Sequence, residues 1–188
     1  MDMPSPKGDP TYIKNKERFY MNVAKAISQA STHPKCPGGC IIVRDREIIG
    51  DGRSILTDSM VEIDCISYAV AAAAKAGTPA IGGVIYTTRY PFSTSVFQAH
   101  MMGIKKIVLL AHDWEPYYKE EFRRSARLAR ELNIAIEPMF EDEDPRFTKN
   151  SNDRDIDETL FPEANPFAPD EYDPNNATHT FDENTTPI

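Results

Sequence analysis

The stretch Asp64-Cys65-Ile66-Ser67-Tyr68-Ala69-Val70 opens the part of the chain that decides its fold. It leads into an alanine-rich run that ends at Gly77, and alanine is the strongest helix former. Asp64 suits the N-cap position and Gly77 the position after the last turn, so we expect a helix over residues 64–76. The small alanine side chains would also let this helix pack closely against a sheet.

A strand, a turn and another helix follow the helix predicted at 64–76. A β-branched and aromatic run predicts a strand over residues 83–88, and Pro91 then interrupts the pattern. We expect the next helix to have Ser93 as its N-cap and to stop at Gly103. Immediately after it, Ile104-Lys105-Lys106-Ile107-Val108-Leu109-Leu110 predicts another strand, over residues 106–111.

The flanking segments extend the alternation of strands and helices in both directions. They show the same signal, hydrophobic periodicity bounded by turn residues. We expect a helix at 13–30, a hairpin of strands at 40–43 and 47–50, a helix at 118–132 and a strand at 134–136. This order predicts an α/β protein with a mixed five-stranded sheet covered by helices on both faces.

The two helix starts and the strand after them resemble the zinc-dependent cytidine and deoxycytidylate deaminase family. Members carry His-x-Glu at the start of one helix, Pro-Cys-x-x-Cys at the start of the next, and then a Gly-Ile-Lys-(Lys/Arg)-(Ile/Val)-Val strand. Here Ala73-Ala74-Lys75-x-Gly77, Pro91 and Gly103-Ile104-Lys105-Lys106 match that frame. The resemblance covers about residues 15–138 and implies the family's three-layer α/β/α fold.

The residues that carry the family's chemistry differ in this chain. In the family a zinc ion lowers the pKa of a bound water, and the glutamate moves protons to and from the base. The frame places the zinc-binding His on Asp64, the Glu on Ile66, and the two Cys on Phe92 and Ser95. Ile66 and Phe92 can neither bind zinc nor transfer a proton. The resemblance therefore implies a degenerate member, for which we expect no zinc cofactor and no catalysis.

A second set of metal-ligand types is present near the predicted hairpin. His33-x-x-Cys36-x-x-x-Cys40, together with Cys65, would supply four ligands for a rearranged zinc site. The alternative is that these thiols are buried as small hydrophobic groups.

The cleft in which family members bind zinc and substrate can be interpreted in two ways in this chain. Tyr68 and Tyr90 would give it an aromatic lining, and Arg53, Lys35 and Arg89 could meet a phosphate, so it could bind a nucleotide without reacting. The alternative is a cleft that filled with side chains once the metal was lost.

Charge is distributed unevenly along the chain. The formal net charge is −8. Residues 141–188 hold 14 acidic and 3 basic residues, a net charge of −11, and residues 1–140 hold 15 and 18, a net of +3. An acidic tail on a slightly basic body predicts docking on a basic surface, its own or a partner's, although it could also serve only solubility. The overall charge argues against a nucleic-acid partner.

Prolines and acidic residues predict an extended tail over residues 139–188. Its aromatic side chains look like anchors for a partner: Phe147, Phe161, Phe167, Tyr172 and Phe181. We thus divide the chain into an irregular lead (1–12), a cytidine-deaminase-like domain (13–138) and this tail.

Several features indicate a cytoplasmic protein. No apolar run approaches the roughly 20 residues of a membrane-spanning helix, and residues 1–10 lack the apolar core of a signal peptide. Three cysteines, an odd number, fit a reducing compartment.

The sequence therefore predicts a catalytically inactive deaminase-like protein that acts through protein–protein binding, as a structural or regulatory subunit or as a homo-oligomer. Two alternatives stay open: a metal-free nucleotide-binding regulator, and a divergent active (deoxy)cytidylate deaminase with a rearranged metal site.

Overall fold

A computed structural model describes residues 10–111 and 118–140 of the chain. The described elements are, in order, α1 (Pro10–Ser28), β1 (Gly39–Arg44), β2 (Glu47–Arg53), β3 (Ile55–Leu56), β4 (Glu62–Ile63), α2 (Cys65–Lys75), β5 (Val84–Thr87), α3 (Ser93–Met101), β6 (Lys106–Leu110), α4 (Lys119–Glu131) and β7 (Ala135–Met139).

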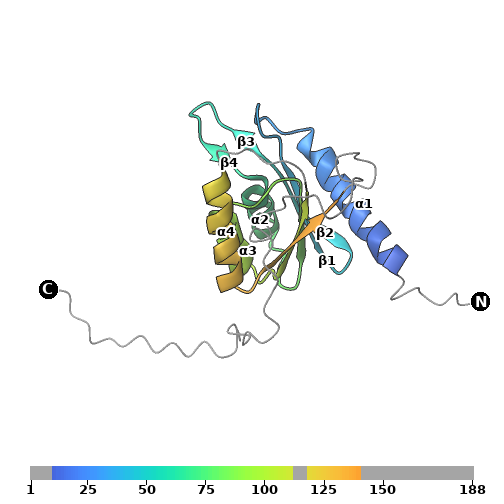
Figure 1. Cartoon of the computed structure of the whole chain (residues 1–188). Coiled ribbons are helices and arrows are strands. Elements are labelled where there is room, and N and C mark those ends of the chain that lie inside the picture. Colours follow the sequence, from blue (N-terminus) through green and yellow to red (C-terminus); the bar gives the residue numbers. More distant parts are fainter. Residues whose placement is uncertain (1–9, 112–117, 141–188) are drawn as a thin grey trace, which may run out of the picture.

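Five of these strands form one mixed sheet in the order β2-β1-β5-β6-β7. β1 runs antiparallel to both β2 and β5, whereas β5, β6 and β7 are parallel. Figure 1 shows α1 on one face of this sheet and α2, α3 and α4 on the other. The mixed five-stranded sheet and the three layers predicted from the sequence are confirmed.

Side chains alternate between the two faces along each strand and build a core on each side. Ile42 and Ile85 belong to the core under α2, α3 and α4. Their neighbours Ile41 and Tyr86 belong to the core under α1.

Glycines in the hairpin bring the helices close to the sheet. A Cβ atom on Gly52 would lie 2.2 Å from the carbonyl oxygen of Cys65, the first residue of α2. A Cβ on Gly39 would lie 2.0 Å from the carbonyl oxygen of Ala24 in α1. The first turn of α2 thus rests directly on β2, which fixes where Asp64 lies.

The element boundaries differ from the predictions in a few places. α1 begins at Pro10, inside the predicted lead, and proline is well suited to a first helical position. β2 continues to Arg53, and β3 and β4 form a small hairpin that was not predicted, because two-residue strands carry no alternation. β7 runs on to Met139, the first residue of the predicted tail.

The aromatic anchors predicted for the tail lie outside the described residues. None of the helices in the described part of the chain is both long enough and apolar enough to span a membrane.

Candidate functional site

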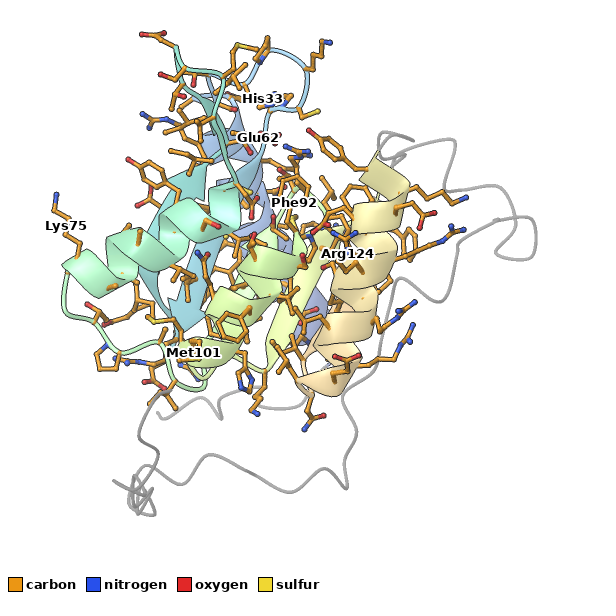
Figure 2. The ribbon with its side chains drawn as sticks, turned by 90° about the vertical axis from the view of Figure 1, so that its left-hand side faces the viewer. His33, Glu62, Lys75, Phe92, Met101 and Arg124 are labelled. Atoms are coloured by element: carbon orange, nitrogen blue, oxygen red, sulfur yellow. The ribbon has the colours of Figure 1, made fainter. Side chains whose placement is uncertain are left out.

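The candidate site lies where α2 and α3 begin. Asp64 directly precedes α2, and Phe92 directly precedes α3. Figure 2 shows His33, Glu62 and Phe92 toward one end of the row of helices, with Met101 at the far end of α3. The first turns of α2 and α3 are in contact, and two of the four positions expected from the resemblance, Asp64 and Ser95, bond to each other there.

Asp64 and Ser95 are in direct contact. The Ser95 hydroxyl donates a hydrogen bond to Asp64 Oδ2, and Ser67 Oγ lies 3.3 Å from Ser95 Oγ. Asp64 was predicted as the N-cap of α2 and occupies that position, but its side chain makes no capping bond there. Burial raises the pKa of Asp64, although the bond from Ser95 and the charge of Arg89 oppose the shift.

Cys65 extends this inner cluster without contributing a thiolate. Its Sγ lies 3.5 Å from Asp64 Oδ1 and 3.6 Å from Thr87 Oγ1. Burial raises the pKa of the Cys65 thiol, and the neighbouring Asp64 carboxylate raises it further. Ile66 is fully buried in the core and presents no polar atom. We call Asp64, Cys65, Thr87 and Ser95 the inner cluster.

These residues do not fit the zinc ion that the fold family implies. One oxygen of Asp64 is taken by Ser95, the Cys65 thiol is kept neutral, and Phe92 offers only a carbon ring. Zinc sites in proteins use thiolate, imidazole or carboxylate groups that converge on one point.

An ion pair forms the outer part of the site. Arg89 is 5% exposed, and its Nη1 donates to Glu62 Oε1 at 2.9 Å and to the Cys36 carbonyl at 3.3 Å. Tyr118 donates its hydroxyl proton to Glu62 Oε2 at 2.9 Å, and His33 Nε2 lies 3.6 Å from Glu62 Oε1. Glu62 thus neutralises the buried guanidinium and joins β4 to α4.

Aromatic rings hold the same guanidinium in place. Arg89 Cζ lies 5.6 Å from the ring centre of Phe92 and 5.5 Å from that of Tyr118, within the range of cation–π attraction. The two rings are 5.3 Å apart, and Phe122 packs against both. Burial and the bond to Glu62 raise the pKa of Tyr118 to about 12, so its phenol is neutral near pH 7. We call Glu62, Arg89, Phe92 and Tyr118 the outer cluster.

The start of α3 is capped by a side chain from α4. Ser93 was predicted as the N-cap, but Phe92 holds that position and Ser93 is the first helical residue. The Ser93 amide and hydroxyl donate to Glu121 Oε1 at 2.8 and 2.6 Å. Arg124 Nη1 in turn donates to Glu121 Oε2 at 2.9 Å.

The predicted pocket residues are not all brought together. Tyr90 is 1% exposed and packs against Phe122 in the core, with their ring centres 4.8 Å apart. Tyr68 and Arg53 are partly buried, and Lys35 is exposed. Only Arg89 joins the outer cluster.

The residues of the alternative metal site, His33, Cys36, Cys40 and Cys65, make other contacts or lie buried as free thiols. His33 Nδ1 accepts the Cys36 amide at 2.9 Å, so that nitrogen is not available to a metal. Cys36, Cys40 and Cys65 are buried free thiols. Within residues 10–111 and 118–140, no group of three or more His, Cys, Asp and Glu side chains is placed to hold a metal ion.

Sequence reasoning missed Glu62, Tyr118 and Glu121 as members of the site. Each acts across a long stretch of chain: Glu62 and Arg89 are 27 positions apart, Ser93 and Glu121 are 28 apart, and Glu62 and Tyr118 are 56 apart. No local pattern marks such contacts.

The chain matches no protein-family model and no curated protein at the level of sequence. Its similarity to solved structures lies in the fold. The described fold is the cytidine-deaminase-like fold, and two examples with this fold are similar to the chain.

One is the dCMP deaminase of the cyanophage S-TIM5 in its apo form, with a TM-score of 0.54, 18% identity, and coverage of 70% of this chain and 99% of that one. Its complex with dCMP and dUMP gives a TM-score of 0.57 at 16% identity. Another is the diaminohydroxyphosphoribosylaminopyrimidine deaminase/reductase of Thermotoga maritima, with a TM-score of 0.54 and 18% identity; the match covers 66% of this chain and 36% of that one.

Proposed function

We propose that this chain is a catalytically inactive deaminase-fold protein that works by protein–protein binding, as a structural or regulatory subunit. The observation that carries the proposal is the direct hydrogen bond between Ser95 and Asp64. These are the positions on which the resemblance places the first and the last metal ligand. Their side chains bond to each other instead.

The surroundings support the same proposal. The position of the family's proton-transferring glutamate holds Ile66, which is fully buried. Phe92, at the remaining ligand position, packs against Arg89 and Tyr118. Each group that the chemistry would need is replaced by one that packs or pairs.

An exposed apolar surface on α3 supports the binding role. Phe97 and Met101, four residues apart on one face, are 51% and 68% exposed, and Ile81 beside Gly103 is 63% exposed. Lys75 is the one Lys, Arg, Asp or Glu in α2 and α3 together. Exposed apolar surface with so little charge is typical of a protein interface, including one between copies of the same chain. In Figure 2 Met101 lies at the end of α3 away from Phe92.

The experiment that tests the loss of the metal site is its reconstruction. The native protein should contain no stoichiometric zinc by elemental analysis and should not deaminate dCMP. The triple variant D64H/F92C/S95C should gain one zinc per chain, because it restores three converging ligands at the two helix starts. The double variant D64H/S95C, which lacks the third ligand, is the matched control. Stoichiometric zinc in the native protein would overturn the proposal.

The binding role is tested on the α3 surface. Light scattering of the native protein should report a mass above that of one chain, either because the chain forms a homo-oligomer or because a partner protein is bound. F97E/M101E should lose that association because it places two charges on an apolar contact surface. K75Q is the control, since Lys75 is exposed on the neighbouring helix.

A second function, nucleotide binding without chemistry, is favoured by three polar atoms. Arg89 Nη2, Arg53 Nε and Ser54 Oγ are buried and have no hydrogen-bond partner among the described residues. Ser54 Oγ and Arg89 Cδ both approach Gly38, at 2.5 and 2.7 Å from where its Cβ would lie. Buried polar atoms normally have partners, and a bound phosphate or water would supply one. If nucleotide binds here, added dCMP should raise the melting temperature of the native protein. The melting temperature of R89M, measured with and without dCMP, should not change.

A further inference from the structure

The outward side of α4 carries a dense cluster of arginines. Residues 123–130 contain four arginines, of which Arg123 and Arg124 pair with Glu120 and Glu121 in the preceding turn. Arg123, Arg124, Arg127 and Arg130 are all exposed, while Phe122, Ser125, Ala126 and Ala129 between them are buried. Figure 2 shows nitrogen-tipped side chains projecting outward from α4 in the region of Arg124. We call these four residues the arginine face.

The tail has the complementary charge. Residues 141–188 hold 14 acidic and 3 basic residues, and the first four, Glu141 to Asp144, are all acidic. Carboxylates are the groups that guanidinium binds best, because two parallel hydrogen bonds can form.

The tail also starts at the same end of the sheet as α4. β6 and β7 are parallel and are joined through α4, so the carboxyl end of β7 lies at the end of the sheet where α4 begins. A helix of 13 residues is about 20 Å long, and about six extended residues cover that distance. The tail of 48 residues is therefore several times longer than α4 when extended, and its covalent attachment to the same chain gives its acidic residues a high effective concentration near the arginine face.

We propose that residues 141–188 dock on the arginine face of the same chain. This goes beyond the proposed function, because it adds a regulatory contact: an acidic partner that binds α4 must first displace the tail. The inference rests on the charge complementarity and on the position where the tail begins.

The test places a spin label in the tail of the full-length protein. Cys36, Cys40 and Cys65 are buried, so a nitroxide will attach selectively to a new cysteine at S151C. In NMR spectra at low salt, the label should broaden the amide signals of residues 123–130 more than those of α1 or α2. The broadening should disappear in about 1 M salt, where the screening length falls to about 3 Å.

Two variants with the same change in charge decide whether the arginine face is the site. R123Q/R124Q/R127Q/R130Q should abolish the broadening of α4, and glutamine preserves helix propensity. R18Q/K35Q/K75Q/K105Q removes four other exposed or partly exposed cations and should leave it unchanged. Broadening that is uniform over the body, or lost equally in both variants, would overturn the proposal.

Two further measurements distinguish the tail of the same chain from other possible occupants of the arginine face. Isotope-labelled chains without the nitroxide are combined with unlabelled chains that carry it. Broadening of α4 in this mixture would assign the contact to a second copy and overturn docking within one chain. Shifts of the α4 amides with single-stranded DNA, in the absence of tail broadening, would assign the face to nucleic acid. Neither result depends on zinc content or deaminase activity, so this proposal fails independently of the proposed function.

Discussion

The inner and outer clusters fill neighbouring parts of one site in different ways. The inner cluster is a set of hydrogen bonds among Asp64, Ser95, Cys65 and Thr87, and no cation of the described residues is in direct contact with it. The outer cluster is an ion pair, Glu62 with Arg89, enclosed by aromatic rings. Two buried polar groups are thus accommodated in different ways, Asp64 by hydrogen bonds and Arg89 by an ion pair.

This difference decides how each cluster affects the stability of the fold. Removing one partner of a buried ion pair leaves an uncompensated charge, which is costly. Removing the charge from a buried carboxyl that has no ion-pair partner relieves a cost instead. The outer cluster should therefore contribute stability, and the inner cluster should contribute a dependence on pH.

The largest effect is expected for R89M. Methionine fills part of the space but leaves Glu62 without its cation, so we expect the free energy of unfolding to fall by about 3–5 kcal/mol. Urea unfolding of the native protein and the variant measures the change. R127M, at an exposed position of α4, is the control and should change stability by less than about 0.5 kcal/mol. A loss for R89M no larger than for R127M would show that the ion pair is dispensable.

A smaller effect, with a defined dependence on pH, is expected for D64N. Burial raises the pKa of Asp64, so the folded state retains a proton that the unfolded chain has already released. The native protein therefore loses stability as the pH rises from the unfolded pKa of about 4 to the folded pKa, and the loss persists above it. Asparagine carries no charge and keeps an oxygen for Ser95.

D64N should thus be more stable than the native protein at neutral pH, and the two should converge below pH 4. Unfolding measured at several pH values, with D58N at an exposed position as control, checks this. A variant that is less stable at neutral pH would mean that the Asp64 carboxylate is stabilised by Arg89 more than burial destabilises it.

The smallest effect is expected for Y118F. It removes one hydrogen bond to Glu62 and keeps the ring against Arg89, so a loss of about 1 kcal/mol is expected. Combining Y118F with R89M sharpens the comparison, because both residues act on Glu62 and their effects should not add. Additive losses would show that the Tyr118 hydroxyl and Arg89 act on Glu62 independently of each other.

The order of helices and strands was predicted well from the sequence, because each of these elements has its own local pattern of apolar residues. The alanine run of α2 and the apolar run of β6 each fall within one element, so periodicity locates them. The positions Asp64, Ile66, Phe92 and Ser95 were predicted from the resemblance, and the contact of Asp64 with Ser95 is compatible with that register.

The outer cluster could not be predicted in the same way. Glu62 lies in a strand of two residues, too short for a pattern, and its partners Arg89 and Tyr118 come from separate elements. The same holds for the capping of Ser93 by Glu121, because the predicted cap was local and the observed one is not. Tertiary contacts between charged residues leave no periodic signal.

The capping of α3 by Glu121 has a consequence for how the molecule opens. The Ser93 amide belongs to α3 and its acceptor, the partly exposed Glu121 side chain, belongs to α4, so the amide can exchange with solvent when Glu121 turns away or when the two helices separate. The same separation would break the bond from Tyr118 to Glu62 and uncover Phe92. Exchange of this one proton is thus tied to the contact between α3 and α4, and its rate sets a lower limit on the free energy of opening α4 from the rest of the fold.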